Sequence, residues 1–128
     1  MARIVWLIEE TLKAIHQRQI AEHGGSPGVR DEGLLQSALA RPRNLFAYSD
    51  REPDLAELAA SYAFGLVRNH PFIDGNKRTG FVAARTFLLL NEADLLDSPE
   101  EKYLTFLRLA EGAISEEQLA GWIREHLT

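Results

Sequence analysis

The sequence contains no cysteine, and this excludes both a disulfide framework and a metal site built from thiolates. Such a composition fits the reducing cytosol. No apolar run approaches the roughly 20 residues that a helix needs to cross a bilayer. The first six residues, Met-Ala-Arg-Ile-Val-Trp, lack the apolar core and the cleavage site of a signal peptide. We therefore expect a cytoplasmic protein with no membrane partner.

An excess of positive charge is also missing. The chain has 19 acidic and 14 basic residues, for a net charge of −5. This argues against nucleic acid as a direct partner, because a phosphate backbone is bound by a basic face. With 128 residues, 45% of them hydrophobic and 26% charged, the composition is that of an ordinary soluble protein. We expect residues 1–128 to form one domain.

Strand patterns are scarce, whereas nearly every segment has the apolar spacing of a helix. Residues 8–22 predict a first helix, and residues 81–90 are apolar almost all round, which predicts a helix surrounded by others. Side chains that cap a first turn mark four more helix starts: Asp31, Asp54 with Glu57, Ser98 before a proline, and Ser115 with Gln118. We expect a compact all-α fold of about six helices.

Residues 41–53 interrupt this pattern, because they contain two prolines and no helical period. We interpret them as a loop or a small hairpin. A polar motif separates the helix that begins at Asp54 from the apolar segment 81–90. We expect this motif to lead into the central and most buried helix.

The motif, residues 70–80, reads His-Pro-Phe-Ile-Asp-Gly-Asn-Lys-Arg-Thr-Gly. Gly75 and Asn76 tolerate left-handed conformations and can turn the chain sharply. A helix that begins near Asn76 or Lys77 points its free N–H groups at this turn, where they favour an anion. Lys77 and Arg78 occupy a first turn that normally prefers acidic residues. Each is unfavourable there by about 0.3–1 kcal/mol unless an anion is bound.

Two further side chains complete the chemistry of the motif. Histidine is the side chain whose unperturbed pKa lies near neutral pH, which makes His70 a candidate base for a hydroxyl proton. Asp74 is a single carboxylate beside a predicted phosphate site, a pattern typical of bound Mg²⁺. An oriented hydroxyl, a metal ion and cations are the parts that phosphoryl transfer requires. Each residue alone also has a structural explanation, since histidines end helices and Asp-Gly-Asn is common in turns. Their combination in one short loop favours a functional site.

The motif resembles the signature of Fic-domain proteins, and most closely that of the Doc (death on curing) branch. Doc proteins are the toxins of type II toxin–antitoxin pairs. The resemblance extends to the Gly24-Gly25-Ser26-Pro27-Gly28 turn, to Asn44–Tyr48 and to the helix end at Asn91, and so covers essentially the whole chain. It implies a cognate, Phd-like antitoxin as a partner, because no inhibitory helix of the kind found in many Fic proteins is evident.

The resemblance also implies roles for the motif residues. His70 would take the proton of the target hydroxyl, and Asp74 would position Mg²⁺. The phosphates of ATP would be held by the next four residues: Gly75, Asn76, Lys77 and Arg78. AMP-transferring Fic proteins have glycine at the position of Lys77, whereas Doc toxins have lysine. Lys77 therefore implies transfer of the γ-phosphate to a threonine, in Doc toxins one of elongation factor Tu, with inhibition of translation.

Two other interpretations stay open, namely a nucleotidyltransferase that transfers AMP and a binding module without catalytic activity. Phe81 disfavours the first, because AMP-transferring relatives have a second arginine at that position. Arg68 and Arg85 are weaker candidates for phosphate contacts. Arg85 lies in an otherwise apolar helix, where a buried cation must reach the phosphates or, as we favour, pair with a carboxylate.

Residues outside the motif give weaker signals. The 41–53 segment, with Asn44, Tyr48 and Arg51, is a candidate flap for docking a target strand, on the basis of the resemblance and of the tendency of loops to carry recognition. His16 and His126 lie in predicted helices, and we expect them at the surface or at its boundary without a function.

Overall fold

The computed structural model describes residues 3–96 and 98–128. Met1, Ala2 and Asp97, which fall within the predicted 1–128 domain, lie outside the described residues. The described residues form six helices, in the order α1 (Glu9–His23), α2 (Glu32–Tyr48), α3 (Leu55–Asn69), α4 (Asn76–Leu90), α5 (Pro99–Ala110) and α6 (Glu116–Glu125). They contain no strand, only two isolated β-bridges. The predicted all-α fold of about six helices is confirmed.

The helices are short, from 10 residues in α6 to 17 residues in α2. None of those within residues 3–96 and 98–128 is both long enough and apolar enough to cross a bilayer.

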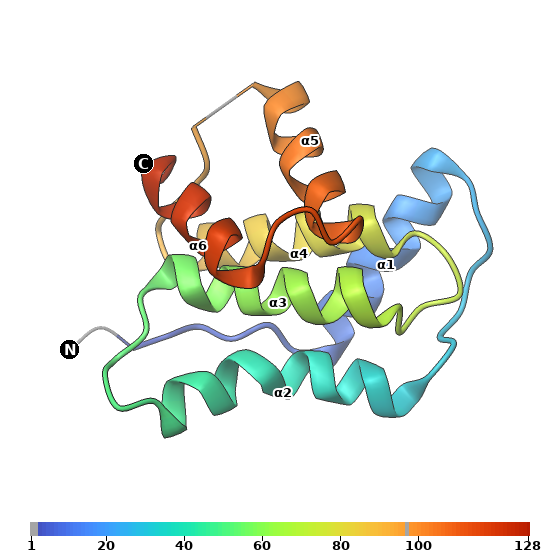
Figure 1. Ribbon diagram of the computed structural model, residues 1–128. Helices are drawn as coiled ribbons and strands as arrows, with labels where there is room; N and C mark the ends of the chain where they lie inside the picture. The colour runs from blue at the N-terminus through green and yellow to red at the C-terminus, as the bar shows by residue number, and fades with distance from the viewer. Residues whose placement is uncertain (1–2, 97) are drawn as a thin grey trace.

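The central helix is α3, around which α2, α4, α5 and α6 pack (Figure 1). Its sequence explains this position, because small and apolar residues occupy almost every face and ten of its fifteen residues are buried. The motif loop thus leaves the most buried helix and enters α4, the reverse of the predicted order. Residues 81–90 are likewise less enclosed than expected, since Leu89 and Leu90 at the end of α4 are exposed.

Glycines allow α3 to approach its neighbours closely. A methyl group at Gly65 would lie 3.3 Å from the Cα of Ala38 on α2. A methyl group at Gly80 on α4 would collide with Cγ2 of Val67 on α3. The absence of a side chain at Gly80 therefore lets α4 lie close against α3, and this close packing restrains the two ends of the motif loop.

The capping signals are confirmed. Asp54 accepts a hydrogen bond from the backbone N–H of Glu57 at 2.9 Å, and the Glu57 side chain returns to the N–H of Asp54. Ser115 and Gln118 form the second capping box, at the start of α6. Asp31 caps α2, and Ser98 caps α5. These short-range bonds explain why the helix starts could be read from the sequence.

The expectation of a loop or hairpin at residues 41–53 is wrong. Helix α2 continues through a buried Pro42 as far as Tyr48. A proline inside a helix costs about 3 kcal/mol, because it removes one hydrogen bond and crowds the preceding turn. Here Pro42 lies on the buried face, and Leu45 and Phe46 after it pack against the core. Tertiary packing outweighs the local preference.

The interpretation of residues 41–53 as a flap that docks a target strand is also wrong, because this segment lies far from the motif loop. The connection from α2 to α3 lies at the opposite end of the molecule from the loop between α3 and α4 (Figure 1). Arg51 in this connection forms an ion pair with Glu57 at 2.9 Å. Asn44 and Tyr48 belong to α2 itself.

Candidate active site

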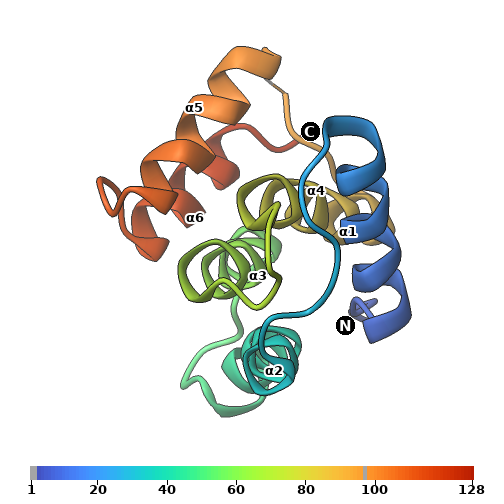
Figure 2. The same cartoon turned by 90° about the vertical axis from the view of Figure 1, so that its right-hand side faces the viewer.

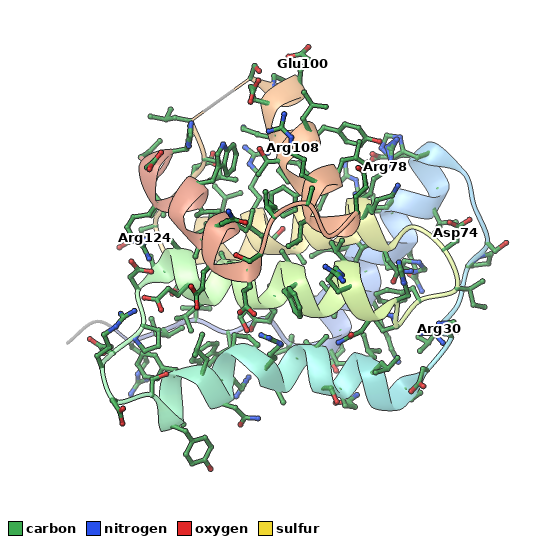
Figure 3. The ribbon with its side chains drawn as sticks, in the orientation of Figure 1. Arg30, Asp74, Arg78, Glu100, Arg108 and Arg124 are labelled. Carbon is green, nitrogen blue, oxygen red and sulfur yellow. The ribbon has the colours of Figure 1, made fainter. Side chains whose placement is uncertain are left out.

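A cleft of about 660 Å³ opens where the α3–α4 loop meets the end of α1, the α1–α2 connection and α5. This volume is within the range of small-molecule sites, about 300–1,000 Å³. Six of the residues proposed from the sequence line it: His70, Asp74, Gly75, Asn76, Lys77 and Arg78. Figure 3 shows Asp74 and Arg78 at this end of the molecule, with Arg124 at the other.

His70 ends α3 in a left-handed conformation, with φ 52° and ψ 60°. This conformation costs a non-glycine residue about 1–2 kcal/mol, so the surrounding structure must stabilise it. The imidazole is exposed at the cleft and makes no hydrogen bond to the described residues. Its nitrogens are therefore available to a bound molecule.

The turn into α4 has the predicted form at Gly75 and a different one at Asn76. Gly75 is left-handed, with φ 76°. Asn76, by contrast, is the first residue of the helix and is buried. Its side-chain oxygen accepts from the N–H of Phe72 at 3.0 Å, and its side-chain nitrogen donates to the carbonyl of Phe72, also at 3.0 Å. The Asn76 side chain therefore closes the loop, which leaves only its backbone N–H for phosphates.

The start of α4 is unlike that of the other helices. No side chain caps it, which is also true of α1, but its first turn contains no acidic residue, whereas each of the other described helices has at least one glutamate there. Lys77 and Arg78 are exposed in this turn, and neither forms an ion pair within the part of the chain that the structure describes. Uncapped N–H groups and two cations without an ion pair favour an anion at this position.

Asp74 immediately precedes Gly75, the residue that caps this turn. One carboxylate oxygen accepts from the N–H of Gly75 at 2.9 Å and the other from the N–H of Ser26 at 3.3 Å. The two bonds orient the carboxylate, and each oxygen retains acceptor capacity. Residues 3–96 and 98–128 contain no cluster of three or more potential metal ligands. A lone oriented carboxylate fits Mg²⁺, which binds through one or two carboxylates together with phosphate oxygens and water.

His16 is a site residue that the sequence analysis missed, and the expectation that it lies at the surface is wrong. It is 3% exposed, and its Nε2–H donates to the carbonyl of Asp74 at 2.9 Å. Its ring stacks on Phe72, with 3.8 Å between centroids and 6° between planes. Leu12 and Gln19 share the buried face of α1 with it. Two of these three buried residues are polar, so no apolar spacing in the sequence marks His16 as buried.

The α1–α2 connection contributes a second missed element. It runs beside the motif loop (Figure 2), and an antiparallel bridge joins Val29 to Phe72. The N–H of Ile73 donates to the carbonyl of Gly28 at 3.1 Å. Arg30 from the same connection lines the cleft and donates to backbone carbonyls at the end of α3. Tyr103 on α5, half exposed, also lines the cleft.

The two weaker candidates lie outside the cleft lining. Arg85 is exposed rather than buried, and it forms a two-point ion pair with Asp94, at 2.9 and 3.1 Å. The structural pairing that we favoured is the one observed. The hydrogen bond from Arg85, with a second from the N–H of Leu95, lowers the pKa of Asp94 to about 2. Arg68 extends over the ring of Phe64, 5.8 Å from its centroid.

Known proteins are similar to this chain in sequence. Residues 6–88 match the family model described as Fic/DOC family. "Protein kinase doc" of Escherichia phage P1 is 37% identical over 115 residues, 90% of each chain. "Toxin Doc" of Mycolicibacterium smegmatis (strain ATCC 700084 / mc(2)155) is 47% identical over 72 residues, 56% of this chain and 55% of that protein. The phage similarity spans nearly the full length of both chains and supports a kinase-type enzyme. The chain belongs to the Fic/DOC family, and within it to the Doc toxins.

Proposed function

We propose that this protein transfers the γ-phosphate of ATP to a threonine hydroxyl of a translation factor, elongation factor Tu by resemblance, and so inhibits translation. One observation carries the proposal. The uncapped first turn of α4, with Lys77 and Arg78, lies in the same cleft as the unpartnered imidazole of His70. The lysine matters most, because a glycine there is the mark of the AMP-transferring branch.

In this proposal the cleft residues have three roles: phosphate binding, proton acceptance and metal binding. Lys77, Arg78 and the first N–H groups of α4 bind the phosphates and stabilise the charge that develops during transfer. His70 accepts the proton of the attacking hydroxyl. The hydroxyl oxygen forms a bond to the γ-phosphorus as the bond to the β–γ bridging oxygen breaks, and ADP leaves. Asp74 would hold Mg²⁺, which supplies neutralisation of phosphate charge.

The test uses ATP labelled at either the α- or the γ-phosphate, incubated with the protein and elongation factor Tu. We expect label only from the γ position, and mass spectrometry of the target should show the addition of one phosphate. Transfer from the α position, with an added AMP, would establish the alternative, a nucleotidyltransferase. The His70→Ala variant is the control for both reactions.

The same variant addresses the third interpretation, a binding module without chemistry. We expect His70→Ala to lose its toxicity in cells while it still folds. Toxicity that survives the substitution would show that the protein acts by sequestering a partner. The resemblance further suggests action in the cytoplasm and neutralisation by a Phd-like antitoxin. Co-expression with a Phd-like protein tests the neutralisation, because it should abolish the toxicity.

A further inference from the structure

We propose that Arg30 is a positioning residue that holds the proposed base, His70, in its left-handed conformation. Three successive carbonyl groups around His70 accept hydrogen bonds from this one residue. Nη2 of Arg30 donates to the carbonyl of Asn69 at 2.8 Å, and Nε donates to the carbonyl of His70 at 2.7 Å. The backbone N–H of Arg30 donates to the carbonyl of Pro71 at 2.7 Å.

The sequence after α3 explains why the end of this helix needs hydrogen bonds from another segment. We call the three bonds from Arg30 the Arg30 clamp. A helix that ends in a left-handed residue usually satisfies its last carbonyls through N–H groups of the residues that follow. Here the next residue is Pro71, which has no N–H to donate. Among the described residues, no backbone N–H caps the end of α3, in contrast to the ends of the five other helices. The guanidinium of Arg30 takes over this function from another segment.

The charge and the planar geometry of the Arg30 guanidinium suit it to the end of α3. A cation at a helix C-terminus interacts favourably with the helix dipole, and hydrogen bonds from a charged donor are stronger than neutral ones. Nε and Nη2 of a guanidinium form a rigid fork, so Asn69 and His70 are held relative to each other. The backbone dihedrals of His70 set the position of its imidazole. Arg30 thereby acts on the base without contacting the reacting atoms.

Arg30 also lines the cleft, so a direct contact with the nucleotide is the competing explanation. The two roles predict different kinetics. Loss of a positioning residue lowers kcat with little effect on nucleotide affinity, because misplacement of a reacting group by about 1 Å can cost 10²-fold in rate. Loss of a phosphate contact weakens nucleotide binding. This kinetic distinction rests on the proposed function.

The experiment compares Arg30→Ala and Arg30→Lys with Arg18→Ala, which removes an exposed arginine whose one ion pair among the described residues is with Glu22 on α1. For Arg30→Ala we expect kcat to fall by roughly 10- to 100-fold, with the Kd for ATP within about threefold of the wild type. Arg30→Lys should recover part of this loss, since an ammonium can reach one carbonyl. Added methylguanidinium should restore activity to Arg30→Ala. A raised Kd with unchanged kcat, or no change in either, would overturn the proposal.

A second measurement does not depend on catalysis. The Cα and Cβ chemical shifts of His70, from NMR of the full chain without nucleotide, report whether its backbone is left-handed. We expect these shifts to move toward ordinary values in Arg30→Ala and less so in Arg30→Lys. Unchanged shifts in both variants would overturn the clamp. Should the wild type transfer no phosphate, the proposed function fails while this measurement still decides the role of Arg30.

Discussion

The imidazole of His16 lies parallel to the ring of Phe72, with 3.8 Å between the two centroids. The same imidazole donates to the carbonyl of Asp74 at 2.9 Å. One side chain of α1 therefore supports the motif loop at two points, one on either side of Ile73. The loop is held in shape by the first helix of the chain, 58 residues before Asp74.

His16→Phe separates the two contacts, because it keeps an aromatic ring and removes the donor. We expect it to destabilise the fold by about 1–2 kcal/mol, since the Asp74 carbonyl loses its partner. His16→Ala should cost more, because it also removes the stacking, worth about 0.5–1.5 kcal/mol. Urea unfolding measures both changes.

A matched control is His126→Ala. His126 also stacks on an aromatic ring, that of Trp122, and bonds the Trp122 carbonyl, but it lies at the end of α6 outside the cleft. We expect the control to lose stability and keep its phosphate transfer, whereas the His16 variants lose both. Equal activity in all three variants would contradict a role for His16 in supporting the loop.

Substitutions at His70 and Lys77 should affect different quantities, the rate of phosphate transfer and the affinity for ATP. Removal of the base in His70→Ala should lower the transfer rate by about 10²–10⁴-fold with ATP still bound. Lys77→Ala removes a cation that the structure leaves unpaired within residues 3–96 and 98–128, and it should weaken ATP binding. Isothermal titration and a single-turnover assay give the two quantities. Retained transfer in His70→Ala would require another base.

Two neighbouring glycines test the placement of Asp74. Gly24 and Gly25 both have positive φ, so alanine is strained at either position. A methyl group at Gly25 would lie 2.8 Å from Oδ2 of Asp74, whereas one at Gly24 would meet nothing within 4 Å. We expect both variants to lose stability, Gly25→Ala more because its methyl group would also lie 3.1 Å from Cδ1 of Ile20, but only Gly25→Ala to need more Mg²⁺ for half-maximal transfer. The same Mg²⁺ dependence in both would argue against Asp74 as the metal ligand.

The parts of the fold and the site that could be predicted depend on local signals. A capping box such as Asp54 with Glu57 spans only three residues, so it can be recognised from the sequence alone. The left-handed turn at Gly75 and the cationic first turn with Lys77 and Arg78 are local in the same sense. These signals were sufficient to place six residues in one cleft.

What could not be predicted depends on contacts between distant segments. Proline is locally unfavourable inside a helix, so the sequence predicts a break at Pro42. The helix continues because its buried face packs against the core, and this packing outweighs the local cost. Arg30 donates to carbonyl groups that lie 39 and 40 residues later in the sequence. No sequence pattern predicts a hydrogen bond over such a separation.

Gly80 and Gly121 should respond oppositely to alanine. At Gly80 the added methyl would collide with Val67 where α4 crosses α3, so we expect a loss of about 1–3 kcal/mol. At Gly121, within α6, it would meet nothing within 4 Å, and alanine should stabilise the helix by about 0.5–1 kcal/mol. Thermal unfolding of the two variants checks both signs. Similar effects at both positions would show that the α3–α4 crossing adjusts freely.

The Arg85–Asp94 pair predicts how stability changes in acid. The pKa of Asp94 in the fold is about 2, below its ordinary value of 3.8, mainly because of the hydrogen bond from Arg85. A lowered pKa means that the carboxylate form is favoured by folding. Its contribution is therefore complete above pH 3.8 and disappears as the pH falls toward 2.

Both side chains of this pair are partly exposed, so its contribution near neutrality should be only about 0.2–1 kcal/mol. Arg85→Met should be less stable than the wild type by that amount at pH 6, and the two unfolding free energies should converge between pH 3.8 and about 2. The control is Arg85→Met in an Asp94→Asn background, which has no carboxylate to titrate, so the effect of the arginine substitution should show no such window there. If the difference between wild type and Arg85→Met stays constant from pH 6 to about 2, Arg85 is not what lowers the pKa of Asp94. The bond from the N–H of Leu95 at 2.7 Å would then be the dominant cause.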